Sequence, residues 1–234
     1  MRRCVTLDAL GTLVELDDPF ARLHEELTER GAPVTPEQAE HALRAEMSYY
    51  RAHHDEAVDE VALADLRAAC VGVLADALPR TGLDAAALLD ALLAALRFVA
   101  LPGARDALLA WQEEGVARVV VSNWDVSLHA VLRETGLAPL LDAVVTSAEA
   151  GVAKPDPAIF AGALALVGCA PEDAVHVGDS VEHDVAGALA AGMGVVLVTG
   201  GAPAPDVPAG TLLVDGIGVL AEPRTALPYP GTQR

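Results

Sequence analysis

Residues 3–13 of the chain read RCVTLDALGTL. The apolar run around Val5 predicts a buried strand, which ends on Asp8 before a Gly-Thr turn interrupts it. In an open α/β sheet, ligands bind beyond the carboxyl ends of the strands. Asp8 is therefore either a binding-site carboxylate or an ordinary turn residue that bonds to its own backbone. The rest of the chain has to distinguish the two.

The composition limits what kind of protein this is. The chain has 234 residues, of which 53% are hydrophobic and 3% aromatic, so Ala, Leu and Val must fill its core. The formal net charge of −19 argues against nucleic acids and anionic membrane surfaces as partners. A phosphorylated substrate remains compatible with this charge, because a bound Mg²⁺ ion and one lysine can reverse the sign locally.

Several features indicate a cytoplasmic protein. Cys4, Cys70 and Cys169 are widely spaced and form no CxxC pair, which is typical of reduced thiols. The long apolar region 85–101 carries Asp90 and Arg97, so it does not read as a membrane span. We also see no charged-then-apolar leader at the start. We expect no membrane partner, and either a monomer or a homodimer.

The segment from Glu15 to about Leu101 predicts helices and no strand. It is rich in Ala, Leu, Glu and Arg. Thr35 followed by Pro36 is typical of a helix N-cap with proline in the first turn. We expect four helices, at residues 20–27, 35–54, 63–78 and 84–98.

From Arg105 onward, helices and strands alternate in the predicted structure. We expect helices at 105–114, 126–135, 157–167 and 181–191, and strands at 117–121, 143–146, 174–177 and 194–198, with a possible edge strand at 211–215. This alternation indicates an α/β fold with a parallel sheet and helices on both faces.

The ends of the predicted strands carry a set of polar groups. Ser122 and Asn123 end one strand, Lys154 lies in a loop before a proline, and Asp179 and Asp184 frame the start of a helix. The lysine stands out because the other 14 cationic side chains are all arginines. An aspartate can attack phosphorus, and paired carboxylates suit Mg²⁺. This inventory fits phosphoryl transfer, which depends mainly on positioning and charge stabilisation.

This ordered set of residues resembles the four motifs of the haloacid dehalogenase superfamily. The motifs are Asp8 with Gly11-Thr12, Ser122-Asn123, Lys154-Pro155, and Gly178-Asp179-Ser180 with Asp184. The resemblance covers nearly the whole chain. It implies a three-layer Rossmann-like core at residues 1–16 and 101–221, with a helical cap inserted at 17–100. We expect residues 222–234 to form a loose C-terminal tail.

The resemblance also implies a role for each motif residue in a hydrolase of small phosphorylated metabolites. Asp8 would be the nucleophile and, with the backbone carbonyl of Leu10 and the carboxylate of Asp179, would bind Mg²⁺. Asp184 would act on metal-bound water or on Lys154, although it could simply favour the dipole of its helix. The substrate's phosphoryl group would be bound by Gly11, Thr12, Ser122, Asn123 and Lys154.

Leu10 departs from the phosphatase pattern. Phosphatases of this superfamily carry there a second aspartate, which protonates the leaving group and later activates water. General acid–base assistance is worth about 10²–10⁴-fold, and leucine has no proton to give. Either the substrate has a good leaving group, or the chain is a phosphoryl-binding or interaction protein with little or no turnover, or the acid comes from the cap or its joint. The candidates there are Glu15, Asp17, Asp18, His24, His53 and His54.

Two other branches of the superfamily can be compared. The 2-haloacid dehalogenases also lack the second aspartate, but they usually place tyrosine there and lack a metal-binding Gly-Asp-Ser motif. They remain a third, less favoured interpretation. The phosphonate-cleaving branch uses a cap lysine, and the only lysine of this chain is Lys154, outside the cap. That mechanism is excluded.

Overall fold

The chain folds into two compact units. The computed structural model describes residues 3–203, 206–222 and 226–232. One unit comprises Met1–Glu15 and Ala100–Arg234, and the other comprises Leu16–Val99. We call the first the core unit and the second the helical unit.

The core unit is built on a parallel six-stranded sheet. Its strands lie in the order β5 (Ala143–Thr146), β4 (Ala117–Ser122), β1 (Cys4–Leu7), β6 (Ala174–Gly178), β7 (Gly194–Val198) and β8 (Leu212–Val214). Each neighbouring pair is parallel. The predicted parallel sheet is therefore confirmed, and the possible strand at 211–215 is the edge strand β8.

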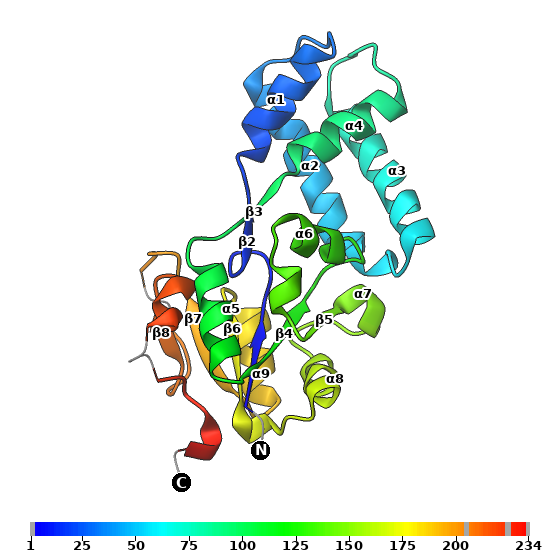
Figure 1. Ribbon diagram of the computed structural model, residues 1–234. Helices are drawn as coiled ribbons and strands as arrows, with labels where there is room; N and C mark the ends of the chain where they lie inside the picture. Colours follow the sequence, from blue (N-terminus) through cyan, green and yellow to red (C-terminus); the bar gives the residue numbers. More distant parts are fainter. Residues whose placement is uncertain (1–2, 204–205, 223–225, 233–234) are drawn as a thin grey trace. The chain divides into compact units, whose positions relative to one another are not determined.

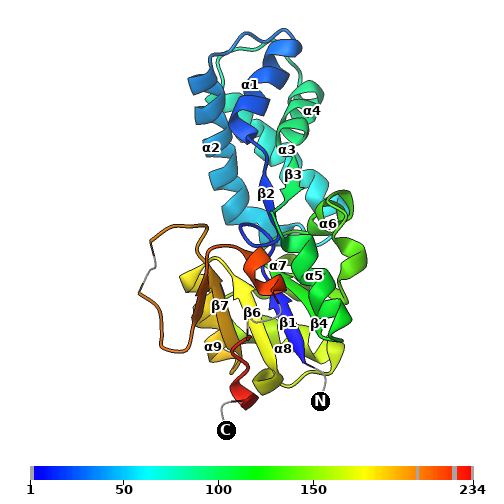
Figure 2. The same ribbon diagram turned by 60° about the vertical axis from the view of Figure 1, so that its left-hand side comes forward.

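Helices flank this sheet and give the α/β core its three layers (Figures 1 and 2). The chain runs outward from β1 to β4 and β5, then returns across the sheet to β6 and β7. Since parallel crossovers are right-handed, this reversal places the two sets of helices on opposite faces. One face carries α8 (Pro157–Val167) and α9 (Ala186–Ala190); the other set comprises α5 (Ala104–Glu113) and α6 (Leu128–Glu134). A short helix, α7 (Ser147–Ala150), follows β5.

Small and branched side chains fill the core beneath α8 and α9. Val119 and Val121 of β4 lie against Phe160 and Leu164 of α8, and all four are almost completely buried. Phe160 is the one aromatic residue of this cluster among the described residues. Close packing of small residues thus replaces the aromatic core that the composition rules out.

The helical unit contains α1 (Pro19–Glu29), α2 (Pro36–His53), α3 (Glu60–Ala77) and α4 (Ala85–Ala95). The predicted start of the second helix is confirmed: Thr35 accepts a hydrogen bond from the backbone N–H of Gln38, whose side chain bonds back to Thr35. The helices bury leucines against one another, including Leu23, Leu27, Leu43, Leu74 and Leu92.

The expectation of no strand between Glu15 and Leu101 is wrong. Two short strands, β2 (Val14–Leu16) and β3 (Phe98–Ala100), pair with each other. The helix predicted to run to Phe98 ends instead at Ala95. Each strand has only three residues, too few for the alternation of polar and apolar side chains to mark it.

Part of the C-terminal segment expected to be loose packs on the core unit. Residues 223–225 and 233–234 lie outside the described residues. Among the described ones, Tyr229 is buried, and the guanidinium of Arg3 lies 4.6 Å from the centre of its ring. This differs from the expected loose tail, because the tyrosine ring gains apolar burial and a cation–π contact.

The described part of the chain contains no helix that is both long and apolar enough to cross a membrane.

Candidate active site

The strand order brings three of the predicted motifs to one edge of the sheet. β1 lies between β4 and β6, and the connections reverse direction here. Asp8 directly follows β1, Ser122 ends β4, and Asp179 directly follows β6. The carboxyl ends of parallel strands at such a reversal form the usual ligand crevice of open α/β sheets. The backbone N–H of Asp8 donates to the carbonyl of Val177, so strand pairing fixes the position of Asp8.

Two side chains from distant parts of the chain bind the same oxygen of Asp8. The hydroxyl of Ser122 donates to Oδ1 at 2.8 Å, and Nζ of Lys154 donates to it at 2.6 Å. All three residues are buried. Asp8 is therefore not a turn residue bonded only to its own backbone.

Lys154 is placed between two carboxylates. Its Nζ also donates to Oδ1 of Asp184 at 2.6 Å. Burial alone would lower the pKa of the lysine, but the charges of Asp8 and Asp184 raise it above its ordinary value. The only lysine of the chain is thus held as a buried cation in contact with Asp8.

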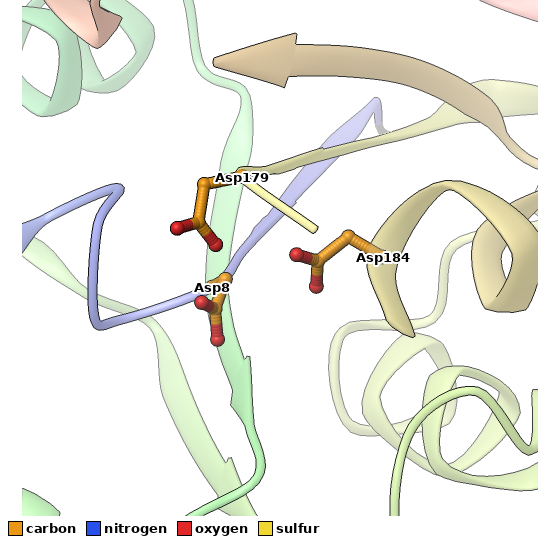
Figure 3. A group of neighbouring side chains, drawn as sticks. All are labelled: Asp8, Asp179 and Asp184. Carbon is orange, nitrogen blue, oxygen red and sulfur yellow. The ribbon is translucent and has the colours of Figure 1, made fainter. Parts of the chain in front are cut away.

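Three carboxyl groups gather at this edge of the sheet (Figure 3). One oxygen from each of Asp8, Asp179 and Asp184 lies within 4.8 Å of the others. Desolvation, together with the negative charges of Asp8 and Asp184, raises the pKa of Asp179 to about 6. Carboxylates crowded in this way repel one another, and a divalent cation would relieve the repulsion.

Gly11 makes room for one of these carboxylates. A Cβ atom at position 11 would lie 2.1 Å from Oδ2 of Asp179, and the backbone φ of +78° also favours glycine. The carboxylate of Asp179 therefore occupies the space that any other residue at position 11 would fill.

Asp184 is held from three directions. Besides Lys154, it accepts hydrogen bonds from the backbone N–H of Ser180 at 2.9 Å and bonds to Nε2 of His176 at 2.9 Å. Burial alone would raise the pKa of Asp184, but the hydrogen bond from His176 and the charge of Lys154 hold it well below its ordinary value. Gly178 leaves space for this group, since a Cβ there would lie 2.2 Å from Cγ of Asp184.

The three other residues predicted to bind the phosphoryl group or the metal differ in their burial and in their hydrogen bonds. Asn123 bonds to the backbone of Lys154 through both polar atoms of its side chain, so its side chain is already engaged. Thr12 is completely buried, and its hydroxyl has no partner among the described residues. Leu10 is 42% exposed, unusually high for a leucine beside a buried cluster.

Sequence reasoning missed two polar residues behind the site. Thr6 and His176 are fully buried, and Oγ1 of Thr6 lies 2.8 Å from Nδ1 of His176. The available signal was that each is a polar residue near the end of an otherwise apolar strand.

Several acid candidates of the helical unit have partners within that unit. The carboxylate of Asp17 forms an ion pair with Arg22, and Asp18 accepts a hydrogen bond at the start of α1. Nδ1 of His53 bonds to the carbonyl of Tyr49, and Nδ1 of His54 bonds to a backbone carbonyl as well. Their use as proton donors stays a prediction.

Comparisons with known proteins place the chain among hydrolases. A family model described as haloacid dehalogenase-like hydrolase matches residues 2–192. A bovine (Bos taurus) protein named haloacid dehalogenase-like hydrolase domain-containing protein 3 is 43% identical over 103 residues, which are 44% of this chain and 41% of that protein. A ribulose-1,5-bisphosphate 5-phosphatase of Halopiger xanaduensis is 38% identical over 122 residues, 51% of each protein. The chain thus spans about half or less of the length of these relatives.

Solved structures show the same fold. A crystal structure of a HAD phosphatase from Thermococcus onnurineus matches with a TM-score of 0.64, covering 93% of this chain and 94% of that one. The sequence identity is 22%, so this similarity concerns the fold alone.

Proposed function

Since this chain belongs to the haloacid dehalogenase-like hydrolase family, we propose that it is a Mg²⁺-dependent phosphatase acting on a small phosphorylated metabolite through a covalent phosphoryl intermediate on Asp8. One observation carries the proposal. Oδ1 of Asp8 is bound by both Ser122 and Lys154 at the edge of the sheet where the other two carboxylates gather. The fixed carboxylate is oriented for attack, and the lysine can neutralise charge on an incoming phosphoryl group.

The proposed reaction has two steps. A carboxylate oxygen of Asp8 attacks phosphorus, and the bond between phosphorus and the leaving oxygen breaks with its electron pair on that oxygen. Water then attacks phosphorus of the aspartyl phosphate, and the bond between phosphorus and the Asp8 oxygen breaks with its electron pair on that oxygen, which releases phosphate and restores the Asp8 carboxylate. Lys154 would hold the phosphoryl oxygens beside Asp8 in both steps. Ser122, Thr12 and backbone N–H groups near Gly11 and Asn123 would bind those oxygens.

The residues present fit a magnesium ion. Asp8 and Asp179 offer hard oxygen ligands, to which the backbone carbonyl of Leu10 would add a third. The space left by Gly11 is what allows the carboxylate of Asp179 to lie there. When bound, the ion would neutralise charge on the phosphoryl group. Asp184, held by Lys154 and His176, would complete the acidic cluster without being needed as a direct ligand.

The relative named a ribulose-1,5-bisphosphate 5-phosphatase supports phosphate-ester chemistry for this chain. The match covers half of each protein, so it supports a reaction class and leaves the substrate open. Four properties of the protein remain predictions: a small phosphorylated substrate, a cytoplasmic location, no nucleic-acid or membrane partner, and a monomeric or homodimeric state.

Leu10 favours a second candidate function. Its exposed side chain has no proton to give to a leaving group. A chain that binds phosphoryl groups with little turnover would need no such donor. This candidate predicts binding of inorganic phosphate without release of phosphate from any ester.

Phosphate release from aryl, acyl and sugar phosphates, measured with and without Mg²⁺, tests both candidates. We expect Mg²⁺-dependent release from at least the aryl or acyl phosphates, and its loss in Asp8→Asn. The matched control is Asp106→Asn, an exposed carboxylate of α5. Phosphate binding without release would favour the second candidate. Release of chloride from 2-chloroacids without metal would instead support dehalogenation.

A further inference from the structure

A line of four buried polar side chains connects the interior of the sheet to the site. Nδ1 of His176 lies 2.8 Å from Oγ1 of Thr6, and its Nε2 lies 2.9 Å from Oδ1 of Asp184. Nζ of Lys154 donates to the same oxygen of Asp184 and to Asp8, at 2.6 Å each. We call Thr6, His176, Asp184 and Lys154 the buried polar line.

His176 is held in place on all sides. It lies in β6, in register with Thr6 of the neighbouring strand β1. The edge of one ring meets the face of the other between His176 and Phe160 of α8, with centroids 4.9 Å apart. The residue is completely buried, so its ring cannot touch a substrate. Any effect of His176 on the site must therefore pass through Asp184.

The contact that His176 makes with Asp184 has a defined direction. A carboxylate at this position accepts hydrogen bonds, so Nε2 must carry the proton that it donates. If the ring is neutral, Nδ1 is then an acceptor, and the hydroxyl of Thr6 is placed to donate to it. Asp184 is 1% exposed and has no access to bulk water to replace a lost donor.

We infer that His176 is a positioning residue, which holds the Asp184 carboxylate and through it keeps Lys154 against Asp8. Without the imidazole, Asp184 would keep only the Lys154 and Ser180 donors and would be free to turn. Lys154 bonds to both carboxylates, so it would follow that movement. The effect on turnover rests on the proposed phosphatase function, whereas the hydrogen-bond geometry does not.

Two variants of His176 test the inference. His176→Gln keeps a donor N–H in the place of Nε2, whereas His176→Leu fills the space without one. With p-nitrophenyl phosphate and Mg²⁺, we expect His176→Leu to lower kcat by about 10- to 100-fold, the usual effect of losing a partner behind a ligand or catalytic group. We expect His176→Gln to recover most of this loss. Equal activity of the two variants, whether both low or both normal, would overturn the inference.

Two variants of Thr6 distinguish loss of its hydrogen bond from a general folding defect. Thr6→Ser keeps the hydroxyl, and Thr6→Val keeps the shape without it. We expect Thr6→Val, but not Thr6→Ser, to lower kcat, with assays run well below the Tm of each folded variant. Full activity of Thr6→Val would contradict the role given to the hydroxyl.

A spectroscopic measurement on the wild-type protein is independent of turnover. Two-bond ¹H–¹⁵N correlation spectra report which imidazole nitrogens carry protons, and comparison with His176→Gln assigns the signals. We expect Nε2 of His176 to be protonated. An unprotonated Nε2 would overturn the inference even in an active enzyme. A wild-type protein that releases no phosphate would count against the proposed function and would leave this measurement valid.

Discussion

The side chain of Asn123 holds both backbone polar groups of Lys154. Its Nδ2 donates to the Lys154 carbonyl at 2.9 Å, and its Oδ1 accepts from the Lys154 N–H at 2.7 Å. Asn123 directly follows β4, and Lys154 lies 31 residues further along the chain. The pair ties the loop that carries the lysine to the end of a central strand.

Removal of the two hydrogen bonds between Asn123 and the Lys154 backbone should lower activity, although no charged group is removed. Asn123→Ala loses two hydrogen bonds, each worth about 0.5–1.5 kcal/mol, so kcat/KM should fall about 5- to 150-fold. Steady-state kinetics with an aryl phosphate measure the effect. Thr135→Ala is the control, because it also removes a bond from a side chain to the backbone, elsewhere in the core unit. Unchanged kinetics in Asn123→Ala would show that Lys154 is positioned without it.

Leu10→Asp should restore the missing proton donor. We expect rates on sugar phosphates, whose leaving alkoxides need a proton, to rise by about 10²–10⁴-fold. Rates on acyl phosphates, which release a stable carboxylate, should change much less. Leu10→Asn, of similar size but unable to protonate a leaving group, is the control. An equal gain with both variants would point to polarity rather than acid catalysis.

Gly11→Ala should disrupt the site through Asp179. The added Cβ would lie 2.1 Å from a carboxylate oxygen, so that carboxylate must move. Binding of Mg²⁺ to the folded state raises Tm, and we expect this Mg²⁺-dependent rise to shrink or disappear in the variant. Gly162→Ala in α8 is the matched control, since nothing lies within 4 Å of a Cβ there. A full Mg²⁺-dependent rise in Gly11→Ala would argue against a metal site at Asp179.

Because of Glu46 in α2, we expect the stability of the folded protein to depend on pH. It is buried, and burial raises the pKa of its carboxyl group, although a hydrogen bond with Cys70 opposes the shift. The folded state therefore binds this proton more tightly than the unfolded state, and Glu46 contributes less stability as pH rises above the ordinary glutamate pKa. Glu46→Gln should raise Tm at pH 7 relative to wild type, by about 2–4 °C for each kcal/mol gained. The gain should shrink near pH 4 in thermal unfolding, and a gain independent of pH would contradict the assignment.

The order of helices and strands was predictable because short sequence patterns indicate where most of these elements begin and end. Apolar runs that end on a polar residue marked β1, β4 and β6, and the Thr35-Pro36 signature marked the start of α2. Strands β2 and β3 were not predictable, since three residues carry no periodicity and their pairing joins residues far apart in the sequence. The packing of Tyr229 depends on the same kind of long-range contact.

The sequence predicted which residues form the candidate site, but it predicted only some of the contacts between them. The parallel sheet explains why Asp8 and Ser122 meet, because both end neighbouring strands. The sequence did not indicate that Asn123 would bond to the Lys154 backbone, or that His176 would bond to Asp184. The first contact joins residues 31 positions apart and the second joins a strand residue to a residue eight positions later, and no spacing rule encodes either of them.

The bonds that Ser122 and Lys154 make to Asp8 have a stereochemical consequence. Both reach Oδ1, and among the described residues none reaches Oδ2. The two oxygens of this carboxylate are therefore no longer equivalent, and the carboxylate cannot turn over without breaking both bonds. In the proposed reaction one particular oxygen would bond to phosphorus in every cycle. Because water attacks phosphorus in that reaction, isotopically labelled oxygen from water should appear in the released phosphate and not in the Asp8 carboxylate.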